Sequence, residues 1–508
     1  MNLFRKTVNV NLRNKNKQHK RIAMKRNQVE GKVSPSLIIT TELTSKQFKF
    51  NFIAQNVLCE FIFTVQSLIF KTLNSEPTLD NWVIPQSIKL PEKMTTPVVN
   101  SGNFIHHSDS LHVALRPIIT LAQCFAVLPV NGINSPDTSG LKFTWRSFKI
   151  LYFGISIIMS SFMTICSLIR LFSTDFHSVK MTALVFSGTT CLTSLLFLKL
   201  ATHWPQFAGY WEKVERELAT RHRRPSKISL VKRCKYITLA IMILALIEHT
   251  LSLASGYLSA RDCAALRGDN DVAKIYFKTQ FPQVFNKTQY AMWKGVVVQC
   301  NNVLSTFSWN FMDLFLILLS TALTYHFSQL NDRLYSVKDK IMPEWWWAEA
   351  RSDYNRLASL TRLVDSYIAG IVVLSFGTNL YFICIQLMYS FDGMASVVRT
   401  IYFCFSFGFL LGRTAAVSLS AASVHDESLL PAPVLYSVNT SSYSTEVMRF
   451  LMQVTTDNVG LTGMKFFSIT RSLVLTVAGT IVTYELVLVQ FNAVQQRAQI
   501  CILGDEFF

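Results

Sequence analysis

Long apolar segments recur along the chain, and their lengths predict helices that cross a membrane. A helix rises about 1.5 Å per residue, so about 20 apolar residues span a hydrocarbon layer of about 30 Å. The segments of suitable length with few charges are 150–172, 181–203, 236–258, 302–327, 367–391, 396–421 and 468–492. We therefore expect an all-α membrane protein with seven transmembrane helices.

Two earlier apolar segments do not qualify as spans. Residues 50–70 are interrupted by several polar side chains, among them Glu60. Residues 111–130 contain Arg116 followed by Pro117 and are of borderline length. We expect this second segment to form a short helix ahead of the first span.

Positive charges predict which ends face the cytoplasm, because short loops rich in Lys and Arg stay on that side. Residues 204–235 hold nine Lys or Arg and residues 328–366 hold six, whereas residues 172–180 hold one. The connection 259–295 also holds six, but long loops follow the rule poorly. We therefore expect the amino end inside the cell and the carboxyl end outside.

The composition supports this class and argues against others. Of the 508 residues, 50% are hydrophobic and 16% are charged, and the net charge is +18. Residues 1–40 hold ten bases and one acid, which beside membrane spans predicts a lipid-facing cytoplasmic tail rather than a nucleic-acid site. We find no nucleophile elbow, P-loop, HExxH or CxxC motif, so we expect no enzyme, metal or cofactor.

The connection between the third and fourth spans carries features typical of an extracellular loop. Asn286 begins an N-glycosylation sequon with Lys287 and Thr288. Cys263 and Cys300 bracket the loop, where an oxidising environment permits a disulfide. We predict a glycan on Asn286 and consider the two cysteines a candidate disulfide.

Polar residues within the spans are candidates for ligand binding, because such groups are costly in lipid and face protein or water instead. They are Glu248 and His249 in the third span, Trp309, Asn310 and Asp313 in the fourth, and Asn379 and Tyr381 in the fifth. Carboxylates, amides and aromatic rings together suit a polyhydroxylated ligand. The alternative is that these groups pair with one another and hold the bundle together.

Two arginines in the sixth span receive a different interpretation. Arg399 and Arg413 are too few and too far apart for the regular basic ladder of a voltage sensor. We expect them near opposite ends of the span, where long side chains reach the membrane surface.

The last span carries a polar face. Thr483, Val487 and Gln490 recur at helical spacing, and lipid does not favour such a face. We expect it to line a pore shared by several copies, in which Gln490 or Phe491 forms a constriction. The alternative is that Gln490 bonds a neighbouring helix.

One motif in this span resembles a known family. Thr483 and Tyr484, five further residues, then Gln490 and Phe491 match the TY(x)5QF signature of insect gustatory receptors. Glu485, directly after the tyrosine, resembles the sugar-receptor branch. Together with the pattern of spans, the resemblance covers roughly residues 110–495.

The resemblance implies a sugar receptor that is a ligand-gated, non-selective cation channel in the plasma membrane of sensory-neuron dendrites. It implies a homotetramer, or a hetero-oligomer with other gustatory receptors, with a small-molecule sugar and membrane lipid as partners. The seventh spans would surround one pore, and the QF pair would lie at its narrow part. The inner ends of spans four to six would anchor the subunits to one another.

These expectations divide the chain into four parts. Residues 1–100 are a cytoplasmic, largely disordered tail, and 101–149 are the pre-span helix and linker. Residues 150–467 form a six-helix ligand-binding bundle that includes a cytoplasmic anchor hairpin at 328–366. Residues 468–508 are the pore-lining seventh helix and a short extracellular tail.

Two rival functions have different signatures. A receptor that signals through a G protein has its amino end outside, which is opposite to the orientation expected here. A transporter is expected to show internal repeats or interrupted half-helices, and we find neither.

The expected orientation makes a testable prediction. Asn286 should carry a glycan, and a tag at Met1 should be inaccessible on intact cells, because the base-rich loop 204–235 remains in the cytosol. Asn286→Gln should remove the glycan, and surface labelling before and after permeabilisation reports the tag. A tag that is labelled on intact cells would contradict this topology.

Overall fold

Six long helices make up most of the computed structural model, which describes residues 109–173, 178–219, 229–390 and 397–484. Each of the six is long and apolar enough to cross a membrane. They are α4 (Phe148–Ser173), α5 (Ser178–Ala219), α6 (Leu230–Arg267), α9 (Met292–Tyr335), α10 (Glu344–Ser390) and α11 (Val397–Leu429). The predicted all-α membrane fold is confirmed, and these helices coincide with the first six predicted spans.

The seventh predicted span is described only in its first part. Arg471–Tyr484 forms a shorter apolar helix, called the terminal helix below. Outside the described residues lie the tail 1–100 and the rest of the span, with Glu485, Val487, Gln490 and Phe491.

Short elements join the long helices. They are α3 (Leu111–Cys124), η2 (Thr138–Gly140), α7 (Val272–Gln280), α8 (Pro282–Phe285), α12 (Pro431–Tyr436), η3 (Thr440–Ser442), α13 (Thr445–Thr456), β1 (Thr462–Gly463) and β2 (Phe467–Ser468). Ser110, Asp271 and Ser444 cap α3, α7 and α13, because each side chain accepts a backbone N–H of the first turn. The two strands form an antiparallel hairpin, which the sequence analysis did not predict.

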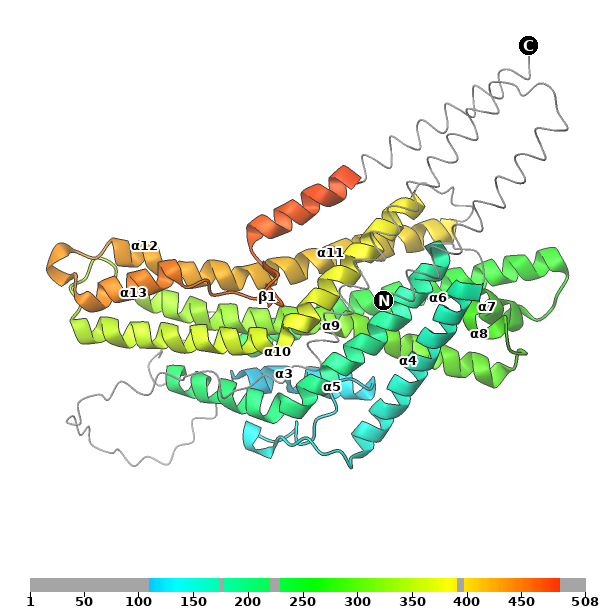
Figure 1. Cartoon of the computed structure of the whole chain (residues 1–508), viewed down its shortest axis with the longest axis horizontal. Coiled ribbons are helices and arrows are strands. Elements are labelled where there is room, and N and C mark those ends of the chain that lie inside the picture. The colour runs from blue at the N-terminus through cyan, green and yellow to red at the C-terminus, as the bar shows by residue number, and fades with distance from the viewer. Residues whose placement is uncertain (1–108, 174–177, 220–228, 391–396, 485–508) are drawn as a thin grey trace, which may run out of the picture. The chain divides into compact units, whose positions relative to one another are not determined.

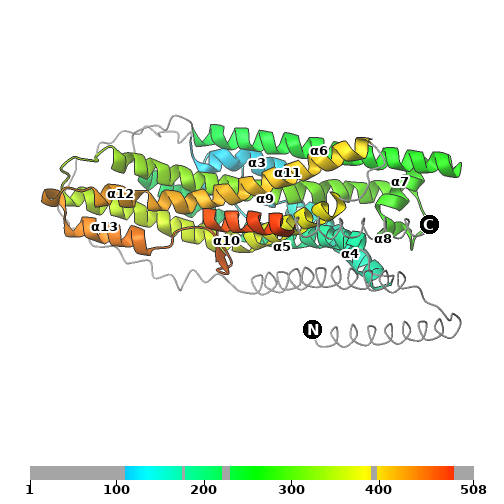
Figure 2. The same cartoon turned by 90° about the horizontal axis from the view of Figure 1, so that it is seen from above.

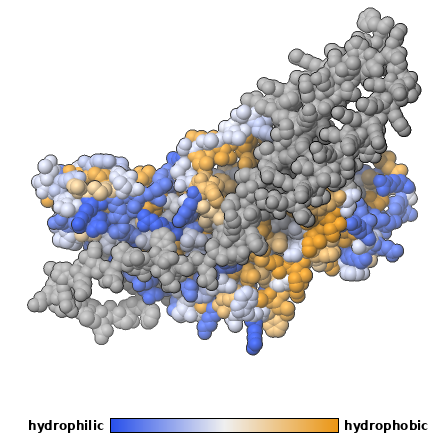
Figure 3. Space-filling view, viewed as in Figure 1, coloured by the Kyte–Doolittle hydropathy of each residue, from blue (hydrophilic) through white to orange (hydrophobic). Residues whose placement is uncertain are grey.

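Burial separates the two central helices from those whose apolar side chains lie at the surface of the bundle. In the most apolar stretches of α9 and α10, 78% of the residues are buried, against 17% in α4 and 6% in α6. Many of the exposed residues of α4 and α6 are large and apolar, for example Ile158 and Leu246. Figures 1 and 2 show α9, α10 and α11 side by side. In Figure 3, hydrophobic residues gather between two hydrophilic ends, as a membrane requires.

The hairpin made by α9 and α10 extends well beyond the predicted spans. α9 continues to Tyr335 and α10 begins at Glu344. The apolar stripe on α10, which includes Tyr354 and Leu357, is completely buried. Tyr354 packs against Phe450 of α13, with ring centroids 5.5 Å apart. A second helix of the same chain thus covers the stripe (Figure 1), although the sequence analysis did not expect α13.

Ion pairs join the hairpin to its neighbours. Asp353, which is fully buried, lies 2.9 Å from Arg333 and 3.0 Å from Arg356. Arg356 also pairs with Glu217 of α5 at 2.7 Å. A buried carboxylate is tolerated only when it is paired, so Asp353 fixes how the hairpin closes.

Asp109 holds three elements together at one end of α3. Its carboxylate accepts hydrogen bonds from the Ser229 hydroxyl at 2.6 Å, the Val231 backbone N–H at 3.0 Å and the Tyr325 hydroxyl at 2.8 Å. Burial opposes ionisation of Asp109, but these hydrogen bonds keep its pKa below the ordinary value. The stabilisation is therefore present at neutral pH and is lost as the pH falls through that lowered pKa.

Replacing Asp109 with Ala should lower the stability of the bundle by about 1.5 to 3 kcal/mol, the usual value for hydrogen bonds to a charged group. The measurement is the melting temperature of detergent-solubilised protein. Asp137→Ala is a matched control, because Asp137 is exposed and, in the described part of the chain, its side chain accepts a hydrogen bond from the nearby Ser139 hydroxyl alone. Equal melting temperatures for the two variants would contradict the structural role of Asp109.

Candidate functional site

A charged pair lies in the middle of the apolar bundle. The Asp313 carboxylate on α9 lies 2.8 Å from Nε of Arg413 on α11, and both side chains are almost completely buried. Asp313 also accepts hydrogen bonds from the Ser375 hydroxyl at 2.5 Å and the Asn379 amide at 3.0 Å. Ser375 and Asn379 are four residues apart on α10 and so face the same way. Three helices therefore meet at one carboxylate.

Arg413 extends this cluster to two further residues. Its guanidinium donates a hydrogen bond to Oδ1 of Asn310, which is 1% exposed. It also lies over the Trp309 ring, 4.4 Å from the centroid. The same indole contacts Phe382, with centroids 4.7 Å apart. We call Trp309, Asn310, Asp313, Ser375, Asn379 and Arg413 the charged centre.

The pair explains how these polar residues are accommodated in a membrane. Burying a single charge costs several kcal/mol, whereas a paired and fully hydrogen-bonded charge costs far less. Removing one partner typically destabilises a protein by about 3 to 5 kcal/mol, because the other charge remains buried. The charged centre therefore fixes the relative positions of α9, α10 and α11.

A second polar layer lies beside the charged centre. The Ser406 hydroxyl donates to Oε1 of Glu248 at 3.0 Å, and the Gln386 amide donates to the same hydroxyl at 3.3 Å. Ser406 precedes Arg413 by seven residues, so the two lie on one face of α11, about 10 Å apart along the helix. On α10, Gln386 follows Asn379 by seven residues, so these two also share one face. The polar surface thus runs for about two helical turns between α6, α10 and α11.

Several buried polar atoms near these layers have no hydrogen-bond partner among the described residues. They include Nε1 of Trp309, Nε2 of His249 and Oε1 of Gln386. Buried polar groups are normally paired, so such atoms indicate places where a ligand or water can bind. The Asp313 oxygens, in contrast, already have partners.

The structure brings together four of the seven predicted ligand-binding residues. Trp309, Asn310, Asp313 and Asn379 all belong to the charged centre, and Glu248 belongs to the second layer. His249 has no described hydrogen bond to either layer. Tyr381 is two residues from Asn379 and points to another side of α10, where it packs edge-on against Phe382.

The expectation for Arg413 was wrong. It does not lie at the membrane surface but is 4% exposed and paired with Asp313. The reason is that an arginine and an aspartate on different spans lower each other's cost of burial. Their joint presence inside apolar spans was a signal that could have predicted the pair. Arg399 is exposed in the first turn of α11, where it has access to solvent or headgroups.

Other predicted sites are described in part. Thr483 is exposed on the terminal helix, and its hydroxyl donates to the Gly479 carbonyl at 2.9 Å. Asn286 is exposed at the end of α8, so a glycan there remains a prediction. Cys263 and Cys300 are free thiols and do not form the candidate disulfide: Cys263 packs against the small cluster of α6 and α7, whereas Cys300 is exposed on α9.

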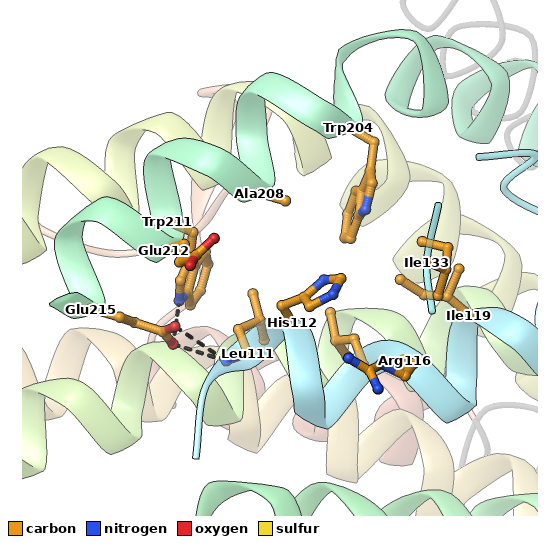
Figure 4. Close-up of a pocket in the computed structure, with 11 residues that line it drawn as sticks. Leu111, His112, Arg116, Ile119, Ile133, Trp204, Ala208, Trp211, Glu212 and Glu215 are labelled. Atoms are coloured by element: carbon orange, nitrogen blue, oxygen red, sulfur yellow. Dashed lines mark hydrogen bonds between the residues drawn. The ribbon is translucent and has the colours of Figure 1, made fainter. Parts of the chain in front are cut away.

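A cavity lies elsewhere, between α3 and α5 (Figure 4). Its walls include Arg116 and Trp204, and Glu215 bonds both the Leu111 N–H and the Trp211 indole beside it. The volume of about 10 Å³ suffices for one water molecule. This cavity is therefore too small for a sugar.

The charged pair makes a prediction about assembly. Arg413→Gln should sharply reduce the surface level of the protein, because it leaves the Asp313 charge buried without its partner. The double variant Asp313→Asn/Arg413→Gln should recover most of that loss, because two amides can bond each other. Quantitative surface labelling measures both variants. Equal losses in the single and double variants would contradict the pairing.

Comparisons with known proteins identify the family. The family model described as "Trehalose receptor" matches residues 89–501. The Drosophila melanogaster protein "Gustatory receptor for sugar taste 64f" is 40% identical over 75% of this chain and 81% of its own length. "Gustatory receptor 5a for trehalose" from the same species is 36% identical over 77% of this chain and 87% of its own length.

A solved structure supports the fold. The insect olfactory receptor OR5 from Machilis hrabei, in complex with eugenol, superposes with a TM-score of 0.54 at 14% identity. The match covers 75% of this chain and 99% of that receptor. The helical bundle with its charged centre is therefore built on an insect chemoreceptor fold, and the chain belongs to the trehalose receptor family, within the sugar-receptor branch of the insect gustatory receptors.

Proposed function

We propose that the protein is a sugar receptor of the plasma membrane that acts as a ligand-gated, non-selective cation channel. The names of its relatives, which mention sugar taste and trehalose, support the ligand class. The observation that carries the proposal is a set of polar residues inside an otherwise apolar bundle. We call this set the polar tract; it consists of the charged centre and the second layer formed by Glu248, Gln386 and Ser406. By family resemblance, the cell is a sensory neuron and the membrane that of its dendrite.

The chemistry of the tract suits a sugar. Sugar hydroxyls donate and accept hydrogen bonds, so they can satisfy both the indole N–H of Trp309 and the carbonyl oxygen of Gln386. Glu248 adds a carboxylate beside Gln386, through Ser406. The Trp309 ring already packs against Arg413 and Phe382, so its N–H rather than its face is the proposed sugar contact.

Asp313 and Arg413 have a different proposed role. Their mutual pairing leaves Asp313 without a free oxygen, so direct sugar contact would require its present hydrogen bonds to be exchanged. We infer that the pair holds Asn379 and Trp309 in place as the floor of the site. A sugar that bonds Trp309 on α9 and Gln386 on α10 changes the energy of the relative position of these two helices, which is the requirement for a ligand to shift a conformational equilibrium. Arg413 joins α11 to α9, so α11 takes part in this change.

The terminal helix is the proposed wall of the pore. Thr476, Thr480 and Thr483 are exposed on one face, and each hydroxyl bonds a carbonyl of its own helix. A hydroxyl-bearing face that is exposed in one subunit suits a water-filled path shared by four copies. Val487, Gln490 and Phe491 would continue this face to the gate. The partners are either identical subunits or other gustatory receptors, and assembly experiments distinguish the two cases.

Recording current in an excised patch tests the function. Trehalose applied to a patch from cells that lack other receptors should open cation current without cytosol. A receptor that signals through a G protein should lose its response there. Absence of sugar-evoked current for any sugar of a broad panel, at normal surface density, would contradict the proposal.

The same recordings test the site. At matched surface level, Asp313→Asn/Arg413→Gln should raise the half-activating sugar concentration by about one to two orders of magnitude, because it removes charged bonds worth about 1.5 to 3 kcal/mol that hold the site in place. Gln386→Ala should raise it about two- to tenfold, because it removes a neutral bond worth about 0.5 to 1.5 kcal/mol. Arg399→Gln, an exposed arginine on the same helix, is the control and should respond normally. Unchanged sensitivity in both site variants would move the sugar site elsewhere.

A further inference from the structure

The base of the terminal helix is tied to the two helices that supply both sides of the polar tract. On α10, the Asp365 carboxylate accepts hydrogen bonds from the Thr462 backbone N–H at 2.6 Å and from the Thr462 hydroxyl at 2.8 Å. On α11, Asp426 pairs with Arg471, the first residue of the terminal helix, at 2.5 Å. These contacts hold both ends of the short segment that leads into the terminal helix.

Further contacts position the start of this segment. The Val459 carbonyl accepts a hydrogen bond from the Ser428 hydroxyl at 3.2 Å and lies 3.1 Å from Nδ1 of His425. Both residues belong to α11. Phe467 of β2 packs against Phe376 of α10, with centroids 5.9 Å apart. In Figure 1 the terminal helix rises directly from the β1–β2 hairpin.

The hairpin itself is strained. Met464 and Lys465 have φ of 52° and 62°, in the left-handed region that side chains disfavour. Such a turn usually contains Asn-Gly. Gly463 cannot be replaced easily, because a Cβ there would lie 2.3 Å from the Phe467 ring. Strained turns persist only where surrounding contacts enforce them, and here the Thr462 hydroxyl both donates to Asp365 and accepts the Lys465 N–H at 3.2 Å.

Both carboxylates are joined to the tract through continuous helix. Asp365 precedes Ser375 by ten residues, a distance of about 15 Å along α10. Asp426 follows Arg413 by thirteen residues, about 20 Å along α11. Each helix is unbroken between these positions, so a shift of α10 relative to α11 must move Asp365 relative to Asp426.

We propose that Asp365 and Asp426 are the coupling residues of the receptor: they transmit the relative position of α10 and α11 to the terminal helix through Thr462 and Arg471. This inference rests on the proposed function, because it assumes that the terminal helix moves when a sugar binds. Neither residue touches the ligand. Both act by positioning the base of the terminal helix.

The Asp365 contact is tested by removing one hydrogen bond at a time. Asp365→Asn and Thr462→Val should each lower the ratio of trehalose-evoked to basal current about tenfold at matched surface level. The double variant should be no worse than Asp365→Asn alone, because both substitutions remove the bond between the Thr462 hydroxyl and the Asp365 carboxylate, whereas Thr462→Val leaves the Thr462 N–H in place. Lys465→Arg, which keeps the positive charge of an exposed side chain near Asp365 in the same hairpin, is the control and should keep the normal ratio.

The Asp426 contact is tested by exchanging charges. Arg471→Asp should lower the current ratio two- to fivefold, the smaller effect expected of a pair whose arginine is largely exposed. Asp426→Arg/Arg471→Asp should restore the ratio. If the pair only stabilised the fold, exchanging its charges would change the surface level and would not restore the open probability at constant surface level.

Ligand binding separates coupling from the sugar site. Every variant should keep a rise in melting temperature on addition of trehalose, because the site itself is intact. Normal current ratios in all the variants, or charge exchange without rescue, would overturn the coupling while leaving the proposed function in place. A native protein that gives no sugar-evoked current would overturn both.

Discussion

The pairing of Asp313 with Arg413 is the constraint on which the rest of the bundle depends. Two opposite charges in an apolar interior are stable only while their geometry is kept, so α9, α10 and α11 cannot slide freely past one another. This gives the helices a small number of discrete arrangements. A small ligand can then shift a long helix, because packed and paired elements respond in steps rather than continuously.

Long, unbroken helices connect this centre to the rest of the chain. α10 runs from the ion pairs of Asp353 through Asp365 to Asn379, and α11 runs from the exposed Arg399 to Asp426. A continuous helix carries displacement over tens of ångströms because its backbone hydrogen bonds are all internal. The same elements therefore provide the α9–α10 hairpin, the polar tract and the contacts at the base of the terminal helix.

The sequence predicted the long helices but missed several short elements and most of the contacts between helices. The lengths of the apolar segments were sufficient to predict six of the helices, because the thickness of a membrane fixes how many residues a span needs. Asn379 and Asp313 were both selected for their polarity, yet their contact with each other and with Ser375 could not be derived. The prediction for Arg413 was wrong for the same reason. The free-energy cost of burying an isolated arginine is high, and Asp313, which lowers this cost, lies a hundred residues earlier in the sequence.

What the sequence alone determined is therefore local: the apolar stretches of six helices, the signature in the last span and the family. The tertiary structure decided which polar groups meet, where each helix ends, which apolar faces are buried, and how Thr462 and Arg471 are held by α10 and α11. The physical reason is that the hydrophobicity of a span depends on residues that are neighbours in the sequence. Pairing of buried charges depends on positions that become close only when the helices pack.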